Sequence, residues 1–139
     1  MHAIAYVSCA SRPLSDDDLE FILLSSRINN EKHGITGVLL HHDSNFLQYI
    51  EGEKDSLLAV YNRIKSSNCH RNIFEMLNGP VPQRYFSSWS MGFATVPKTL
   101  LLKLEQAKWA SQVEDLAGGQ AQSDGVGLLL NFWQYSCKV

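Results

Sequence analysis

The sequence has no long hydrophobic run and few cysteines. None of its apolar stretches approaches the roughly 20 residues that cross a bilayer, and the N-terminus lacks a basic segment followed by a long apolar one. We therefore expect neither membrane insertion nor export. The three cysteines, Cys9, Cys69 and Cys137, form no CxxC pair. Such spacing predicts free thiols in a reducing compartment, and hence a cytoplasmic protein.

The sequence also lacks an excess of positive charge. Its net charge is −2 and its Lys and Arg residues are scattered, which argues against nucleic acid as a partner. The histidines predict no metal site, since the adjacent His41 and His42 would point to opposite faces of a strand. With 139 residues, 45% of them hydrophobic and 19% charged, the chain has the size and composition of one globular domain. The expected partners are small molecules or other proteins.

The hydrophobic pattern predicts alternating strands and helices over residues 1 to 97. A helix should begin near Ser15, because Ser15 and Asp18 have the spacing of an N-cap pair, and its apolar stripe leads from Leu19 to Asn30. The elements expected in chain order are a strand over 3–9, the helix from 15, strands over 35–42 and 45–52, a helix over 55–66, and strands over 72–78 and 89–96. This βαββαββ order predicts an α+β, ferredoxin-like sandwich with a mixed sheet and both helices on one face.

The opposite face of the sheet then needs another cover, and the C-terminal tail is the candidate. Residues 98–116 and 126–137 are expected to form two helices, separated by the Gly-rich break GGQAQSDG at 118–125. We expect these helices to pack on the sheet or on another subunit.

Three polar residues are expected to face the core beneath the helices. Gln48 lies between Phe46 and Ile50 on one face of its strand, and on the first strand Tyr6 and Ser8 share a face. Asn30 ends the apolar stripe of the first helix. A buried primary amide left without partners costs about 1 to 3 kcal/mol, so Gln48 should have specific partners. Neutral donors and acceptors of this kind suit an uncharged, planar, imide-like ligand edge.

From the residues alone, a bland interpretation stays open for each member of this group. A strand tyrosine commonly packs with its hydroxyl at the rim, a helix-end asparagine is often a C-cap, and a buried glutamine often satisfies a loop carbonyl. By the same reasoning Arg63 is a solvated surface charge, and Trp89 and Met91 are core residues.

The same residues carry a family resemblance. The matching segments are YVS (6–8), SRINNEKHGITGVLL (26–40), NFLQYIEGE (45–53), YNRI (61–64), His70 and RYFSSWSMGF (84–93). In this order and spacing the chain resembles the BLUF domain, a sensor of blue light using FAD. The resemblance implies a photosensor domain over residues 1–97, and the tail over 98–139 is similar to the two-helix extension of short, stand-alone members.

The resemblance implies a role for each matching residue. Asn30, with Asn29 beside it, would bind the edge of the flavin ring, Ile22 would pack on the ring, and Gln48 would bridge Tyr6 and the flavin. Arg63 and His70 would lie towards the far side of the ring or the ribityl and phosphate chain, while Ser8, Trp89 and Met91 would relay the signal. The segment before His70 differs from the Asp-x-Arg-His that is frequent in the family.

The resemblance also implies a mechanism without turnover. Light would drive electron and proton transfer from Tyr6, and the hydrogen bonds of Gln48 would rearrange by rotation or tautomerisation to give a red-shifted state. The chain would not be an enzyme; it would signal to a protein partner or through its own oligomeric assembly. FMN or riboflavin in place of FAD stays open, and so do two other functions on this fold, an acylphosphatase-like hydrolase and a regulatory module that binds another metabolite.

Overall fold

The computed structural model describes residues 1–42, 45–67, 70–86 and 92–94. The elements are β1 (His2–Ala10), α1 (Asp16–His33), β2 (Thr36–His42), β3 (Asn45–Gly52), α2 (Lys54–Lys65), β4 (His70–Pro80) and β5 (Gly92–Ala94). The predicted βαββαββ order is confirmed. The predicted tail helices over 98–139 lie outside the described residues.

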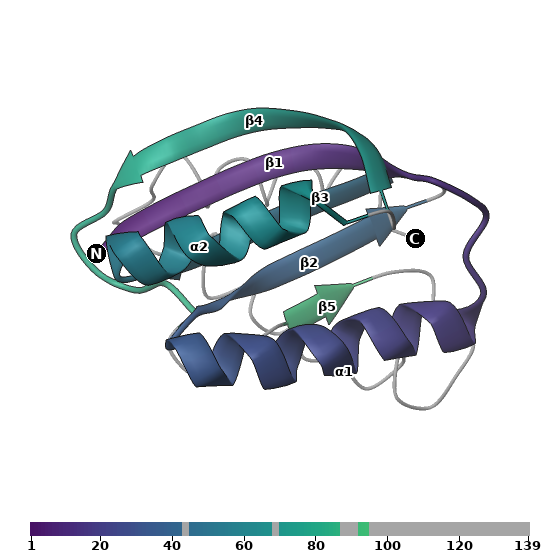
Figure 1. Cartoon of the computed structure of the whole chain (residues 1–139), viewed down its shortest axis with the longest axis horizontal. Coiled ribbons are helices and arrows are strands. Elements are labelled where there is room, and N and C mark those ends of the chain that lie inside the picture. Colours follow the sequence, from purple (N-terminus) through teal and green to yellow (C-terminus); the bar gives the residue numbers. More distant parts are fainter. Residues whose placement is uncertain (43–44, 68–69, 87–91, 95–139) are drawn as a thin grey trace, which may run out of the picture.

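The five strands form one mixed sheet in the order β4-β1-β3-β2-β5. β1 is antiparallel to both β3 and β4, β2 is antiparallel to β3, and β5 runs parallel to β2. Figure 1 shows both helices in front of the sheet, with β4 along its outer edge beside β1. The predicted ferredoxin-like architecture, with two helices on one face, is therefore correct. Among the described residues no helix combines the length and apolarity that crossing a bilayer requires.

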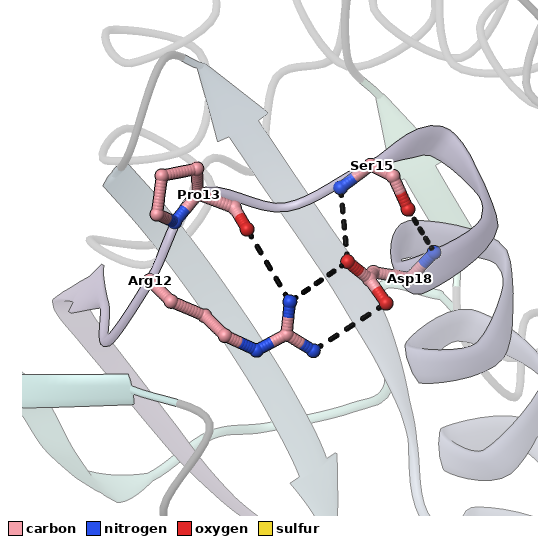
Figure 2. Close-up of polar contacts among 4 residues, drawn as sticks. All are labelled: Arg12, Pro13, Ser15 and Asp18. Atoms are coloured by element: carbon pink, nitrogen blue, oxygen red, sulfur yellow. Dashed lines mark hydrogen bonds and ion pairs between the residues drawn. The ribbon is translucent and has the colours of Figure 1, made fainter.

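Helix α1 begins and ends at residues with strong capping chemistry. The Ser15 hydroxyl accepts a hydrogen bond from the backbone N–H of Asp18, and the Asp18 carboxylate accepts one from the backbone N–H of Ser15, as Figure 2 shows. Arg12 reaches the same carboxylate at 3.0 Å. At the other end Gly34 adopts φ 66°, a left-handed conformation that glycine reaches without strain. The helix thus ends at His33, three residues after Asn30.

A second glycine of the GITG segment is required by a close approach rather than by its backbone angles. A Cβ atom on Gly37 would lie 2.0 Å from the backbone oxygen of Tyr49 on the neighbouring strand. Any side chain there would push β2 away from β3.

The two faces of the sheet build two separate cores. Side chains of α1 and α2 pack on one face, which we call the helix face, around Ile4, Tyr6 and Ile50. The opposite face, the far face, has its own buried cluster, made of Ala3, Ala5, Val38, Leu40, Leu47, Tyr49 and Phe86. The predicted alternation along 45–52 is confirmed, since Phe46 and Gln48 are buried in the helix face and Leu47 and Tyr49 in the far face.

The length of β4 and the cover of the far face differ from the prediction. β4 runs from His70 to Pro80, longer than the expected 72–78, because it pairs along the whole of β1 up to His2. It is an edge strand, where a proline without an N–H is tolerated. The far face is also covered in part by Val81, Tyr85 and Phe86, which follow β4, whereas the prediction assigned its cover to the tail.

Candidate functional site

A cavity of about 260 Å³ opens between α1, α2 and the helix face of the sheet. Its lining residues come from β1, α1, β2, β3 and the α2 region: Tyr6, Phe21, Ile22, Ser25, Ser26, Asn29, Asn30, Leu39, Phe46, Gln48, Val60, Ile64 and Ser67. The walls are mostly apolar, and the polar groups converge where β1 and β3 meet the C-terminal half of α1. Binding sites for small molecules commonly combine an apolar wall with a few placed polar groups.

Tyr6 and Gln48 form the polar centre of the cavity. They are direct partners in the antiparallel register of β1 and β3, and they are 2% and 6% exposed. The Tyr6 hydroxyl donates a hydrogen bond to Oε1 of Gln48. The carbonyl end of the amide is therefore turned to Tyr6, and its NH₂ end is a donor for another partner. The predicted contact between these two side chains is confirmed.

The surroundings of Tyr6 keep its phenol protonated. Burial first, and then the nearby Tyr61, raise the pKa of Tyr6 above its ordinary value. The rings of Tyr6 and Tyr61 have centroids 5.7 Å apart and planes inclined at 36°. Burial and the neighbouring Glu75 carboxylate raise the pKa of Tyr61 to about 12. At neutral pH Tyr6 is therefore protonated and donates a hydrogen bond.

The α1 side of the cavity presents two carboxamides. Asn30 is 3% exposed and faces inward as its place in the apolar stripe predicted. Asn29 also lines the cavity, and its Oδ1 accepts a hydrogen bond of 2.5 Å from the Arg63 guanidinium on α2. This contact joins the two helices across the cavity mouth. Arg63 is exposed, and it contacts a lining residue rather than lining the cavity itself.

The structure brings five of the ten predicted site residues together. Tyr6, Ile22, Asn29, Asn30 and Gln48 all line the one cavity.

The other predicted site residues lie around the cavity or outside the described part of the chain. Ser8 is buried on β1 opposite Phe46. We expected His70 in the loop before the strand over 72–78. It is instead the first residue of β4, opposite Ala10. Trp89 and Met91 lie outside the described residues, so their predicted role in relaying the signal stays a prediction.

Several lining residues escaped the sequence prediction. Leu39 lies opposite Gln48 in the β2–β3 register, and Phe46 shares the face of Gln48. Phe21 and Ser25 lie at i and i+4 along α1, beside the apolar stripe, and Asn29, which was predicted, follows at i+8. The spacing of four was visible in the sequence, but which helix face borders a cavity depends on how the helix is placed over the sheet.

The donors and acceptors described here fit a flavin ring. Flavin presents a planar, largely apolar tricycle with one edge of carbonyl and imide groups, and the cavity presents apolar walls with neutral amides and a phenol at one end. The volume lies just below the range of about 300 to 1,000 Å³ that holds whole drug-sized ligands. It suits a ring system whose attached chain extends past the mouth.

Comparison with known families agrees with this chemistry. Residues 1–92 match the sequence profile of BLUF, described as sensors of blue-light using FAD. The chain belongs to the BLUF family. Its cofactor class is FAD, and its function is that of a blue-light sensor. Neither the hydrolase nor the other regulatory module considered from the sequence is favoured.

Individual BLUF relatives cover different shares of the chain. The photoactivated adenylate cyclase subunit beta of Euglena gracilis is 36% identical over 93 residues, which are 66% of this chain and 11% of that protein. The dark-state structure of the BLUF protein BlrB superposes with a TM-score of 0.64 and 28% identity, covering 84% of this chain and 85% of BlrB. The photo-activated structure of BlsA shares the fold, with a TM-score of 0.67 and 23% identity over 98% and 96% of the two chains. The chain thus spans a small part of the curated cyclase relatives.

Proposed function

We propose that this BLUF chain holds the flavin ring of FAD, without a covalent bond, in the cavity between α1, α2 and the sheet, and that Tyr6 and Gln48 are its photochemical pair. The observation that carries the proposal is the buried hydrogen bond from the Tyr6 hydroxyl to Oε1 of Gln48 at the centre of that cavity. A tyrosine can reduce an excited flavin, and an amide can exchange its donor and acceptor ends by turning over.

The remaining cavity residues would hold and orient the ring. The carboxamide of Asn30 would bond the carbonyl and imide edge, with Asn29 as a further polar contact, and Ile22 would pack against the ring face. Arg63, which already anchors Asn29, would lie towards the far side of the ring or the ribityl and phosphate chain, and His70 is assigned to the same region. In this arrangement the apolar walls would shield the ring from water, and the dinucleotide tail would extend past the mouth.

When bound, the flavin supplies a light-excited state that accepts an electron. Tyr6 would give an electron and its hydroxyl proton to the flavin and would take both back during recombination. While Tyr6 lacks its proton it cannot donate to Oε1 of Gln48, so the bond that fixes the amide is lost for that interval. Gln48 would then turn over or change tautomer, and its altered hydrogen bonding to the flavin would give the red-shifted state.

The signal is proposed to leave through protein contacts and not through a reaction on this chain. Ser8, buried two residues from Tyr6, would take part in the relay together with Trp89 and Met91. The name of the Euglena relative, a photoactivated adenylate cyclase subunit, supports coupling of such a sensor to a separate activity. For this chain we propose a downstream protein partner, a homo-oligomeric state, and a cytoplasmic location, with the tail over 98–139 as the contacting element.

The test is the light-minus-dark absorption spectrum of the purified full chain and of Gln48→Leu. Wild type should be yellow and should show a reversible red shift. Gln48→Leu should retain the flavin and lose the shift entirely, because leucine has neither donor nor acceptor. Gln83→Leu makes the same chemical change at an exposed position and serves as the control. A normal red shift in Gln48→Leu, or a wild-type protein that takes up no flavin, would refute the proposal.

A further inference from the structure

The far face of the sheet holds a carboxylate with an unusual set of partners. Glu51 is 0% exposed, although it lies near the end of β3 beside the polar sequence Gly52-Glu53. It projects to the same face as Leu47 and Tyr49, away from the cavity. Removing a carboxylate from water costs several kcal/mol unless hydrogen bonds replace its hydration. The residues that supply those bonds show what Glu51 holds in place.

Two consecutive backbone N–H groups point at this carboxylate. The Phe86 N–H donates to Oε2 at 2.7 Å, and the Tyr85 N–H lies 2.9 and 3.0 Å from the two oxygens. The hydroxyl of Thr36 donates to Oε2 at 3.0 Å and that of Tyr49 to Oε1 at 3.2 Å. Hydrogen bonds to an ionised acceptor are about twice as strong as neutral ones. Glu51 therefore fastens the segment Arg84–Phe86 to β3 and, through Thr36, to β2.

Arg84 strengthens the same attachment. Its guanidinium donates to the Thr36 hydroxyl at 2.9 Å, to the Glu51 carbonyl at 3.3 Å and to the carbonyl of Gly34, the C-cap of α1, at 2.6 Å. The Phe86 ring packs edge-on against Tyr49, with centroids 5.5 Å apart. The segment is thus joined to β3 by backbone, side-chain and ring contacts together.

These contacts begin one residue from the photochemical glutamine. Tyr49 follows Gln48 on β3, faces the opposite side of the sheet, and donates to the Glu51 carboxylate. A displacement of β3 backbone at Gln48 therefore moves Tyr49 and Glu51, and the two N–H groups that bond Glu51 must follow. Phe86 precedes Trp89 by three residues in the sequence.

We infer that Glu51 is a positioning residue that transmits the light-driven change at Gln48 through the sheet to the segment Arg84–Phe86. The transmission in light rests on the proposed function of Gln48, whereas the attachment of the segment in the dark does not. Both parts can be measured on the same sample.

The variant that tests the inference is Glu51→Gln in the full, FAD-loaded chain. The amide keeps the size of the side chain, but it has one accepting oxygen in place of two and no negative charge, so it cannot accept from all four donors of the carboxylate. Glu53→Gln is the matched control, two residues away and exposed, at the N-cap of α2 where its side chain makes no capping bond. Hydrogen exchange of the Tyr85 and Phe86 amides is measured in the dark and under blue light, alongside the flavin difference spectrum.

In wild type and Glu53→Gln, blue light should change the exchange rate of the Tyr85 and Phe86 amides. In Glu51→Gln these amides should exchange at least about tenfold faster in the dark, because one of the two accepting oxygens and the negative charge that strengthens the bonds are lost. The same variant should keep the flavin red shift and lose the light-induced change in exchange. A purely structural role would also accelerate exchange, but it would leave the light-induced change in place.

Three results would overturn the inference: slow dark exchange in Glu51→Gln, a light-induced change that persists in it, or a wild type that shifts its spectrum without any change at these amides. A wild type without a spectral shift would instead refute the proposed function, and the dark comparison would still decide whether Glu51 holds the segment. If Glu51→Gln does not fold, Thr36→Val removes one donor and the link to Arg84, and it should produce the same two effects at smaller amplitude.

Discussion

The helix face and the far face of the sheet use polar groups in opposite ways. On the helix face the buried polar groups that border the cavity are neutral, Tyr6, Gln48 and Asn30. On the far face the buried polar centre is the carboxylate of Glu51, surrounded by donors within a closed cluster. A neutral amide can reverse its donor and acceptor ends, whereas a carboxylate can only accept. The two faces thus differ in the chemistry of one side chain each, Gln48 and Glu51, which are three residues apart on β3. The hydrogen bonds of Gln48 can reverse, whereas those of Glu51 keep their direction.

The largest expected effect separates the two buried tyrosines. Tyr6→Phe should eliminate the photocycle, because it removes the donor of the electron and proton, while Tyr49→Phe on the far face should retain the flavin red shift. Both residues are buried and both lose only a hydroxyl. The light-minus-dark spectrum of each variant is the measurement. A complete photocycle in Tyr6→Phe would mean that the hydroxyl on the helix face is not needed for the photochemistry.

Core truncation should destabilise the far face more than the cavity wall. Leu→Ala substitutions in well-packed cores cost about 2 to 5 kcal/mol, with the larger values where the site cannot relax. Leu47, in the closed far cluster, should lie in the upper part of that range, and Leu39, which already borders the cavity, in the lower part. Urea unfolding of the flavin-free chains measures the difference. Equal costs would show that the cavity closes when no flavin is bound.

Alkaline pH should lower the free energy of unfolding through the buried tyrosines on both faces of the sheet. Burial is the main cause that raises the pKa of Tyr6 and of Tyr49, with Tyr61 and Glu51 respectively as the next contributors. The unfolded chain releases these protons near pH 10 and the folded chain retains them. The stability contribution is therefore complete below pH 10 and falls above it, by up to about 1.4 kcal/mol per pH unit for each tyrosine.

Urea unfolding between pH 8 and pH 11 measures this decline. Tyr6→Phe and Tyr49→Phe should each reduce its slope above pH 10. An unchanged slope in one variant would show that the phenol on that face is not protected from deprotonation.

The smallest expected effect lies away from both faces, at the start of α1. Ser15→Ala removes one half of the capping box in Figure 2 and should cost about 1 kcal/mol. Ser11→Ala, an exposed serine outside the helix, is the control and should change stability by less than about 0.5 kcal/mol. Equal values for the two variants in urea unfolding would contradict a capping role.

The cap should also be sensitive to acid. The hydrogen bond from Arg12, followed by that from the Ser15 backbone, lowers the pKa of Asp18 to about 2. Its contribution is present above the ordinary carboxyl pKa near 4 and is lost as the pH falls from there towards 2. In Asp18→Asn this part of the acid dependence should disappear from the unfolding curve.

Much of the helix face could be predicted from the sequence, because its signals are local. The period of two places Tyr6 and Gln48 on inward faces, and the helical stripe carries Asn30 inward; the structure confirms all three positions. The family resemblance then supplied the ligand, which the residues alone left open.

The far face could not be predicted in the same way, because its contacts are distant in sequence. Glu51 occurs in the polar sequence Glu51-Gly52-Glu53, where a carboxylate at a strand end is normally solvated. Its donors on Tyr85 and Phe86 come from 34 and 35 residues later in the chain. Likewise, Val81 and Phe86 cover the far face only because of the path that the chain takes after β4. The spacing of apolar residues in the sequence does not predict that path.

For the engineering of light sensors, Gly37 sets a limit on what can be varied. A Cβ atom there would lie 2.0 Å from the Tyr49 oxygen, so no residue larger than glycine fits. Leu39 and Phe46 are better positions to vary, since their side chains border the cavity. A mutant library should leave the codon for Gly37 unchanged, because every replacement would separate the two strands whose spacing sets the position of Gln48.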